Sequence, residues 1–121
     1  MALRAWRWSR FNGAVDDRAW DTVAQLVDWL DGHNRDNGVT PETTRLLRVL
    51  KLSEEVGETT QAVIGALGAN PRKGTTHSWS DVEHELCDVI ITAMVALASL
   101  NPDPQTVFAE RLKHVAARSL G

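Results

Sequence analysis

The sequence predicts an all-α protein, an antiparallel four-helix bundle that assembles as an oligomer. Three observations lead to this prediction. Signals typical of β-strands are nearly absent, and apolar residues in 16–31 recur at the i, i+3, i+4, i+7 spacing of a helix. Glycine, asparagine and proline interrupt the chain at 32–40, 68–79 and 101–104. The chain therefore divides into four helical segments.

Capping residues set the limits of the first two helices. The first helix covers 16–31 and carries Trp20 on its apolar stripe, which indicates a core residue. Thr40 can cap the second helix, which begins with proline, a residue tolerated at the first helical position. We expect this helix to cover 41–66, with Gly68 just past its end.

The last two helices have similar signals. Ser80 and Glu83 match a capping box, which predicts a third helix over 81–100 that ends at an asparagine–proline pair. Asp103 can cap a fourth helix, again with proline at its first position, over 104–118. Both connections are short enough for neighbouring helices to pack side by side.

Length and composition indicate one helical domain over 16–121, preceded by an N-terminal arm over 1–15. The 121 residues are 43% hydrophobic and 24% charged, as in ordinary globular proteins. A formal net charge of -3 argues against a protein that coats nucleic acid, and no apolar run is long enough to span a membrane. The single cysteine, Cys87, fits a reducing compartment and is expected to be a packed thiol. We therefore expect a cytoplasmic protein that binds neither nucleic acid nor membranes.

The third helix is apolar nearly all round. From Val89 to Leu100 its only polar residues are Thr92 and Ser99. Such a helix is buried on every side, and a small four-helix bundle cannot cover it alone. We therefore expect a homodimer or homotetramer; the alternative is a monomer in which this helix forms the centre of the core.

Acidic residues gather on two of the helices. Glu54, Glu55 and Glu58 fall within about 100° of arc on the second helix. Glu85 and Asp88 are three residues apart on the third helix and share one face. If the two helices pack antiparallel, these carboxylates converge and repel one another. A hard divalent cation with oxygen ligands removes the repulsion, and Mg²⁺ is the common choice.

The acidic turns also allow a second interpretation. Glutamate-rich helix faces are often solvated surface, and acidic residues at the start of the third helix can simply complement its N-terminus. Gly57 favours the metal site, because a residue without a side chain permits close approach by a helix, a metal-bound water or a substrate.

The EExxE turn at 54–58 and the ExxD turn at 85–88 are separated by 26 residues. This ordered pair resembles the signature of the MazG-like, all-α nucleoside triphosphate pyrophosphohydrolases, to which the dCTP and dUTP pyrophosphatases are related. The likeness covers about 47–100. It implies a helical dimer or tetramer that cleaves (deoxy)nucleoside triphosphates between the α and β phosphates, a role in nucleotide-pool housecleaning.

The resemblance also implies roles for the five carboxylates. Glu55, Glu58, Glu85 and Asp88 would be ligands of Mg²⁺, with Mn²⁺ as a possible substitute. Glu54 would bind a further metal ion or orient the attacking water, so that Glu54 and Glu55 are the catalytic pair. A metal-bound water is a competent nucleophile near neutral pH.

Family members often carry a basic KxxxNxxR pattern that contacts phosphates. The nearest match here has Arg111 and Arg118 at its ends, with Val115 in place of the asparagine, and Lys113 is a further cation in this segment. The resemblance therefore implies phosphate binding by the fourth helix, with one contact of the pattern missing.

Other residues are candidates for substrate contacts. Arg72 and Lys73 precede a glycine in the loop before the third helix, and two cations there suit a triphosphate tail; the alternative is an ordinary solvated turn. Nucleobases stack on aromatic faces, so Trp29 with His33, and Trp79, are candidates for a base pocket. Trp29 could instead belong to the core.

A different class of function remains open. The chain could be a non-catalytic helical scaffold or regulatory module, in which the acidic turns hold a structural metal ion or bind a basic protein partner. Release of pyrophosphate from nucleotides in the presence of Mg²⁺ separates the two classes.

Overall fold

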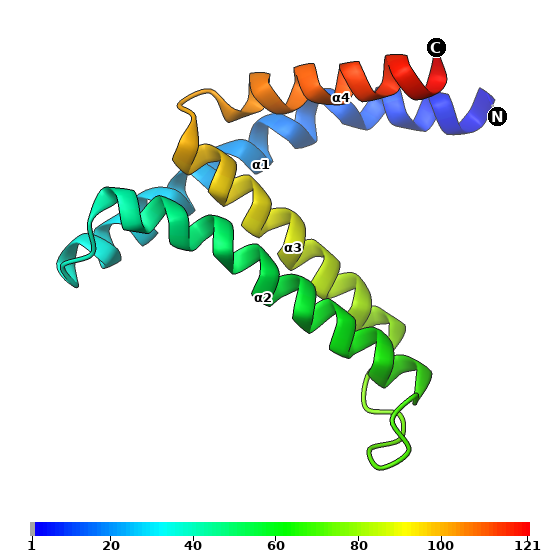
Figure 1. Cartoon of the computed structure of the whole chain (residues 1–121). Helices are drawn as coiled ribbons and strands as arrows, with labels where there is room; N and C mark the ends of the chain where they lie inside the picture. Colours follow the sequence, from blue (N-terminus) through cyan, green and yellow to red (C-terminus); the bar gives the residue numbers. More distant parts are fainter. Residues whose placement is uncertain (1) are drawn as a thin grey trace.

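The computed structural model describes residues 18–121 in full and, for 2–17, the helical backbone alone. The described chain is entirely helical and contains no strand. Its four helices are α1 (Ala2–Asp36), α2 (Pro41–Leu67), α3 (Trp79–Leu100) and α4 (Pro104–Leu120) (Figure 1). The predicted all-α class is confirmed, whereas the separate N-terminal arm expected over 1–15 lies outside the fully described residues.

The first helix continues past its expected end. A break was expected from Gly32, but α1 runs on to Asp36. A single glycine lowers helix stability by only about 1 kcal/mol, so it does not end a helix by itself. The turn needs a positive φ, which Gly38 adopts at 74°. The side-chain amide of Asn37 donates to the carbonyl oxygen of His33 (2.8 Å) and closes the last turn.

Helix α2 begins and ends as predicted. The Thr40 hydroxyl accepts a hydrogen bond from the backbone N–H of Thr43 (3.2 Å). Gly68 caps the other end in the left-handed conformation, with φ 62°, and its N–H donates to the carbonyl of Gly65 (3.2 Å). Thr40 and Gly68 therefore fix the length of the helix that carries Glu54, Glu55 and Glu58.

Helix α3 starts two residues earlier than predicted, and the capping box assigned to Ser80 and Glu83 is wrong. Ser78 is the N-cap: its hydroxyl accepts from the N–H of Asp81 (3.1 Å), and the Asp81 carboxylate accepts from the N–H of Ser78 (2.8 Å). These hydrogen bonds lower the pKa of Asp81. Both serines have an acidic residue three positions later, so the spacing alone did not distinguish them. The predicted cap of α4 by Asp103 is confirmed.

Helices α2 and α3 lie side by side and antiparallel, while the described part of α1 packs across one end of this pair (Figure 1). Helix α4 turns away from α3 by 117°. Among the described residues, no single helix has the length and apolarity of a membrane span; α3 and α4 meet that criterion only when taken together across their bend. A closed four-helix bundle remains a prediction.

The core lies where α1 crosses α3. Trp20 and Val23 of α1 pack with Val95 of α3, which confirms the prediction for Trp20. The Trp20 ring also contacts Phe108 of α4, with ring centroids 6.2 Å apart. This small core therefore joins three helices at one end of the molecule.

Arg48 joins α2 to both of its neighbours, and sequence reasoning missed it. Its side chain is only 8% exposed. One guanidinium nitrogen, Nη1, lies 2.7 Å from the Asp31 carboxylate of α1 and donates to the Ser99 hydroxyl of α3 (2.8 Å). A charged arginine in the apolar sequence Leu46–Leu50 was the available signal.

The single chain leaves α3 partly uncovered. Leu86, Ile90, Ile91 and Leu100 are all exposed, so the described part of one chain does not bury this helix on every side. Cys87 is exposed as well, which contradicts its prediction as a packed thiol. Large apolar side chains are also exposed along α2. The described chain thus presents an apolar surface on the same helices that carry the acidic turns.

Candidate metal centre

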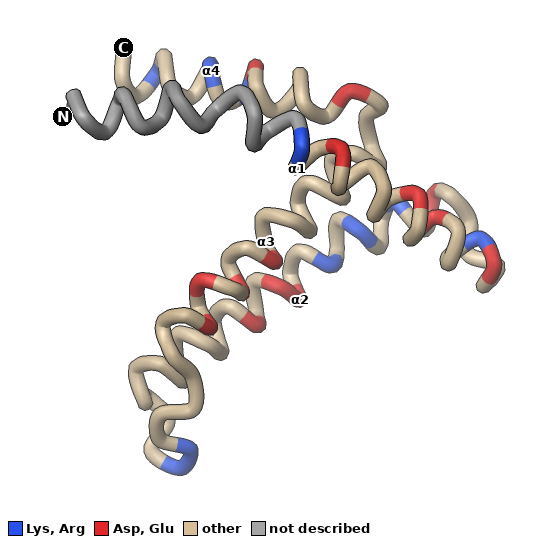
Figure 2. Tube along the Cα trace, turned by 180° about the vertical axis from the view of Figure 1, so that it is seen from behind, with Lys and Arg blue, Asp and Glu red and all other residues tan. Residues whose placement is uncertain are grey.

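The antiparallel pairing of α2 with α3 brings three of the predicted ligands together. Glu55, Glu58 and Glu85 each offer one carboxylate oxygen, and these three oxygens lie within 4.8 Å of one another. Figure 2 shows the acidic residues of the two helices facing each other midway along the pair. Helical spacing sets the first two residues on one face, and the α2–α3 contact supplies the third.

The cluster is poorly neutralised within the chain. The Glu55 side chain is only 12% exposed. Oε2 of Glu55 and Oε2 of Glu85 are buried and have no hydrogen-bond partner. Burial raises the pKa of Glu55, and the charges of neighbouring carboxylates, Glu58 first, raise it further, while the charge of Lys51 opposes them. The folded chain therefore holds the Glu55 carboxylate where its charged form is disfavoured.

These residues fit a hard divalent cation. A buried carboxylate oxygen without a partner costs free energy, and a metal ion would satisfy it directly. Three carboxylates also form the kind of oxygen-rich site that Mg²⁺ prefers. Glu58 is exposed, so water and phosphate oxygens can approach from that side and complete the coordination.

The other two predicted carboxylates lie at the edge of the cluster. Asp88 is exposed and is not one of the three converging residues, but its charge helps to raise the pKa of Glu55. Glu54 is exposed and forms an ion pair with Lys51 (3.1 Å). Both therefore border the cluster without belonging to the three converging carboxylates.

Lys51 is a functional candidate that sequence reasoning missed. Its ammonium nitrogen lies 3.1 Å from Glu54 and 3.7 Å from Glu55. The hydrogen bond to Glu54 is the largest of the effects that raise the pKa of Lys51. The i, i+3 and i, i+4 spacing of these residues on a helix was the signal. Lys51 is the nearest cation to the cluster among the described ion pairs.

No neighbouring helix of the single chain approaches Gly57. A Cβ placed at this glycine would meet nothing within 4 Å, so no helix approaches it there. The open space remains available to a metal-bound water, a substrate or a second copy of the chain. Gly65 is where α2 needs a glycine, because a Cβ there would overlap Thr76 and His77.

The basic residues predicted to hold the phosphates lie away from the carboxylates. Arg72 and Lys73 occupy the loop at the end of the α2–α3 pair (Figure 2), and α2 extends about 14 Å beyond Glu58 before this loop begins. In the opposite direction, about 22 Å of α3 separates Glu85 from the start of the connection to α4. The single chain therefore does not bring the cluster to the residues expected on α4: Arg111, Lys113 and Arg118.

The predicted base-pocket residues are also apart. Trp79 is the first residue of α3, about 24 Å along the helix from Val95, where α1 packs. Trp29 and His33 lie on α1 and are exposed. Trp29 is 70% exposed, so its alternative placement in the core is wrong. One chain does not form a pocket from these three residues.

A different cavity adjoins the metal centre. It has a volume of about 360 Å³ and lies between α1, α2 and α3. Lys51 lines it and contacts Glu55, so the cavity and the carboxylates are neighbours. Its walls are mostly apolar, with Asn34 and Thr92 among its polar groups. Sequence reasoning missed this cavity, because three helices are needed to form it.

Comparison with known proteins does not assign a family. No family model, curated protein or solved structure gives a significant match to this chain. Any function must therefore be argued from the carboxylates and the cavity beside them.

Proposed function

We propose that the chain is a cytoplasmic, Mg²⁺-dependent nucleoside triphosphate pyrophosphohydrolase. The observation that carries the proposal is the convergence of Glu55, Glu58 and Glu85, with two buried carboxylate oxygens that lack a partner. The EExxE and ExxD turns that supply these residues resemble those of the MazG-like enzymes. The products would be a nucleoside monophosphate and pyrophosphate.

Each of the five carboxylates would have a role in the reaction. Glu55, Glu58 and Glu85 would hold the cation, and Asp88 would complete the set. The bound metal would neutralise the triphosphate and lower the pKa of a coordinated water. Glu54 would orient the attacking water or bind a further ion. Attack forms a bond from the water oxygen to the α-phosphorus and breaks the bond to the bridging oxygen, which leaves with pyrophosphate.

Lys51 and the apolar cavity suit the rest of the substrate. Once a metal ion neutralises Glu54 and Glu55, the Lys51 ammonium is free to contact a phosphate oxygen. The cavity of about 360 Å³ is large enough for a nucleoside, and its mixture of apolar walls and a few polar groups is typical of small-molecule sites. The nucleoside would therefore lie between α1, α2 and α3.

We also propose that the active form is a homodimer or homotetramer. The apolar residues exposed on α2 and α3 are the surface that a second copy would cover. Assembly would also allow basic residues of a neighbouring subunit to approach the carboxylates, which the basic loop and α4 do not do within one chain. Light scattering at micromolar concentration should show two or four copies; a monomer of 13.4 kDa contradicts this part of the proposal.

Product analysis tests the hydrolytic function. A panel of nucleoside triphosphates with Mg²⁺ should yield monophosphate and pyrophosphate in equal amounts, and chelation should stop the reaction. In ¹⁸O-labelled water the label should enter the monophosphate, because water attacks the α-phosphorus. A nucleoside diphosphate as first product, or undiminished hydrolysis in excess EDTA, would contradict the proposal.

A scaffold that holds a structural ion is the second candidate. The observation in its favour is the distance of the predicted phosphate-binding residues from the cluster in one chain. In that case Mg²⁺ would raise the melting temperature, but no nucleotide in the panel would be hydrolysed.

A further inference from the structure

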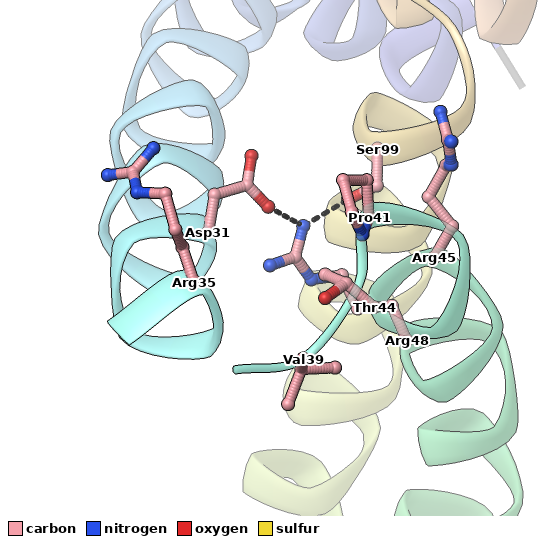
Figure 3. Close-up of a pocket in the computed structure, with 8 residues that line it drawn as sticks. All are labelled: Asp31, Arg35, Val39, Pro41, Thr44, Arg45, Arg48 and Ser99. Carbon is pink, nitrogen blue, oxygen red and sulfur yellow. Dashed lines mark hydrogen bonds and ion pairs between the residues drawn. The ribbon is translucent and has the colours of Figure 1, made fainter. Parts of the chain in front are cut away.

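A second charged cavity lies at the other end of α2. It has a volume of about 260 Å³ and forms where the end of α1, the start of α2 and the end of α3 meet (Figure 3). Its lining includes Arg35, Arg45 and Arg48 but only one acidic residue, Asp31. Three guanidinium groups against one carboxylate leave an excess of two positive charges in the lining.

Arg48 lies in the middle of this cavity, and one of its buried donor nitrogens has no hydrogen-bond acceptor. Its side chain is more than nine-tenths buried, and its Nη1 is occupied by Asp31 and Ser99. Its other terminal nitrogen, Nη2, is buried and has no partner. A guanidinium group stays charged at all accessible pH values and presents its donors in a fixed plane. An unpartnered buried donor is costly, and an anion beside it would satisfy it.

A purely structural role accounts for part of this arrangement only. The ion pair with Asp31 and the bond to Ser99 explain why one arginine is buried here. They do not explain the two further arginines around it. Figure 3 shows Arg35 and Arg45 on opposite sides of Arg48, with their guanidinium groups turned away from it. Neither forms an ion pair with another residue in the described chain, and both are exposed and able to turn inward.

We propose that this cavity binds a phosphate group. A phosphate dianion matches the excess charge of the lining, and its oxygens can accept from several guanidinium groups at once. The start of α2 at Pro41 also lines the cavity and adds the positive end of a helix dipole. Inorganic phosphate, pyrophosphate and nucleotides all present this group, and the chemistry that recognises it is the same for each.

The site shares no residue with the three converging carboxylates, although Arg48 also lines the cavity of about 360 Å³ beside them. Arg48 precedes Glu55 by seven residues, or about 10 Å along α2. The binding proposed here uses the arginines and the start of α2, and it does not depend on a metal ion or on hydrolysis. It can therefore be measured with excess EDTA, where the carboxylates hold no metal ion and no phosphate through one.

Calorimetric titration of the full chain in EDTA tests the proposal. The probes are inorganic phosphate, pyrophosphate, a nucleoside monophosphate and a nucleoside triphosphate. At least one should bind with a Kd of about 1 mM or tighter, a modest affinity expected for a small anion at a partly open site. The double variant Arg35→Gln/Arg45→Gln should weaken binding at least about tenfold. Both substitutions are at exposed positions, so Arg48 and its fold-holding bonds remain.

The control is Arg18→Gln, which removes one positive charge at an exposed position of α1 outside the cavity. Unchanged affinity in the control together with weakened affinity in the first variant supports the proposal. Tighter binding of the nucleotides than of phosphate and pyrophosphate would identify a nucleotide as the source; equal affinity would mean that the phosphate group alone is recognised. No binding of any probe up to about 10 mM, or equal loss in the control and in Arg35→Gln/Arg45→Gln, would overturn the proposal.

Discussion

Two charged regions lie on one face of α2 and differ in how the fold neutralises them. Arg48 and Glu55 are seven residues apart, close to two helical turns, and both side chains are largely buried. The arginine receives a carboxylate from α1 and a hydroxyl from α3. Glu55 instead receives further carboxylates, Glu58 from its own helix and Glu85 from α3.

This difference shows that the charge of Arg48 stabilises the fold, whereas the charges of the carboxylates around Glu55 repel one another. A buried ion with an opposite partner from another helix can hold helices together. Buried ions of like charge cannot, because each additional carboxylate makes ionisation of the others harder. The acidic region is therefore less neutralised by its neighbours than the basic region, and a bound cation would neutralise it. The basic region has one donor without a partner, Nη2 of Arg48.

The largest expected effect is on turnover. Glu85→Gln keeps the size of the side chain but removes the charge of a metal ligand, so kcat/KM for the best nucleotide should fall at least about 100-fold. Glu83→Gln, at an exposed position on the same helix, is the control and should retain activity. Near-normal turnover of Glu85→Gln would remove the acidic region from the mechanism.

Of the two regions, the basic one should contribute more to the free energy of unfolding. Arg48→Met removes the ion pair with Asp31 and the bond to Ser99, and should lower the free energy of unfolding by about 2–3 kcal/mol. The loss is smaller than for a fully buried pair because Asp31 is half exposed and can be hydrated. Urea denaturation measures the change, and Arg45→Gln should differ from the parent by less than about 0.5 kcal/mol. Equal effects of the two substitutions would mean that Arg48 does not hold the helices together.

A smaller effect is expected on the pH dependence of stability in the absence of metal. Burial and neighbouring charge raise the pKa of Glu55 above its ordinary value of 4.5. Between 4.5 and the raised pKa, the unfolded state has lost a proton that the folded state keeps, so stability should fall as the pH rises through this window. In EDTA, Glu55→Gln should therefore be more stable than the parent at pH 7, and the difference should shrink toward pH 4.

Melting temperatures in EDTA across this pH range measure the effect, with the exposed Glu110→Gln as control. Mg²⁺ should stabilise the parent more than Glu55→Gln. A destabilised Glu55→Gln at pH 7 would show that this carboxylate already has sufficient partners without a metal ion.

The smallest expected change is at Gly57, within the acidic turn. Because a Cβ there meets nothing in the chain, Gly57→Ala should stabilise α2 by about 1 kcal/mol. Gly65→Ala on the same helix is the contrasting variant and should destabilise the protein, since its Cβ would overlap Thr76 and His77. Destabilisation by Gly57→Ala that depends on protein concentration would show that a second copy approaches this glycine.

Local signals in the sequence predicted much of the fold because they act over a few residues. Thr40, Gly68 and Asp103 were identified as caps from residue type and spacing, and all three cap their helices. The shared faces of the acidic residues followed from helical periodicity. Where two local signals competed, spacing was not enough: Ser78 rather than Ser80 caps α3, and Gly38 rather than Gly32 supplies the turn after α1.

The sequence by itself determined the four helices and the two acidic turns, because periodicity and capping depend on residues three or four positions apart. Only the tertiary structure decided which side chains meet. Arg48 bonds to Ser99 across 51 positions, and Glu85 reaches Glu55 only because α2 and α3 pack antiparallel. The same packing keeps Trp29 apart from Trp79 and leaves the arginine-lined cavity between three helices. Such contacts depend on how whole helices pack. Spacings of three or four residues in the sequence do not indicate how helices pack.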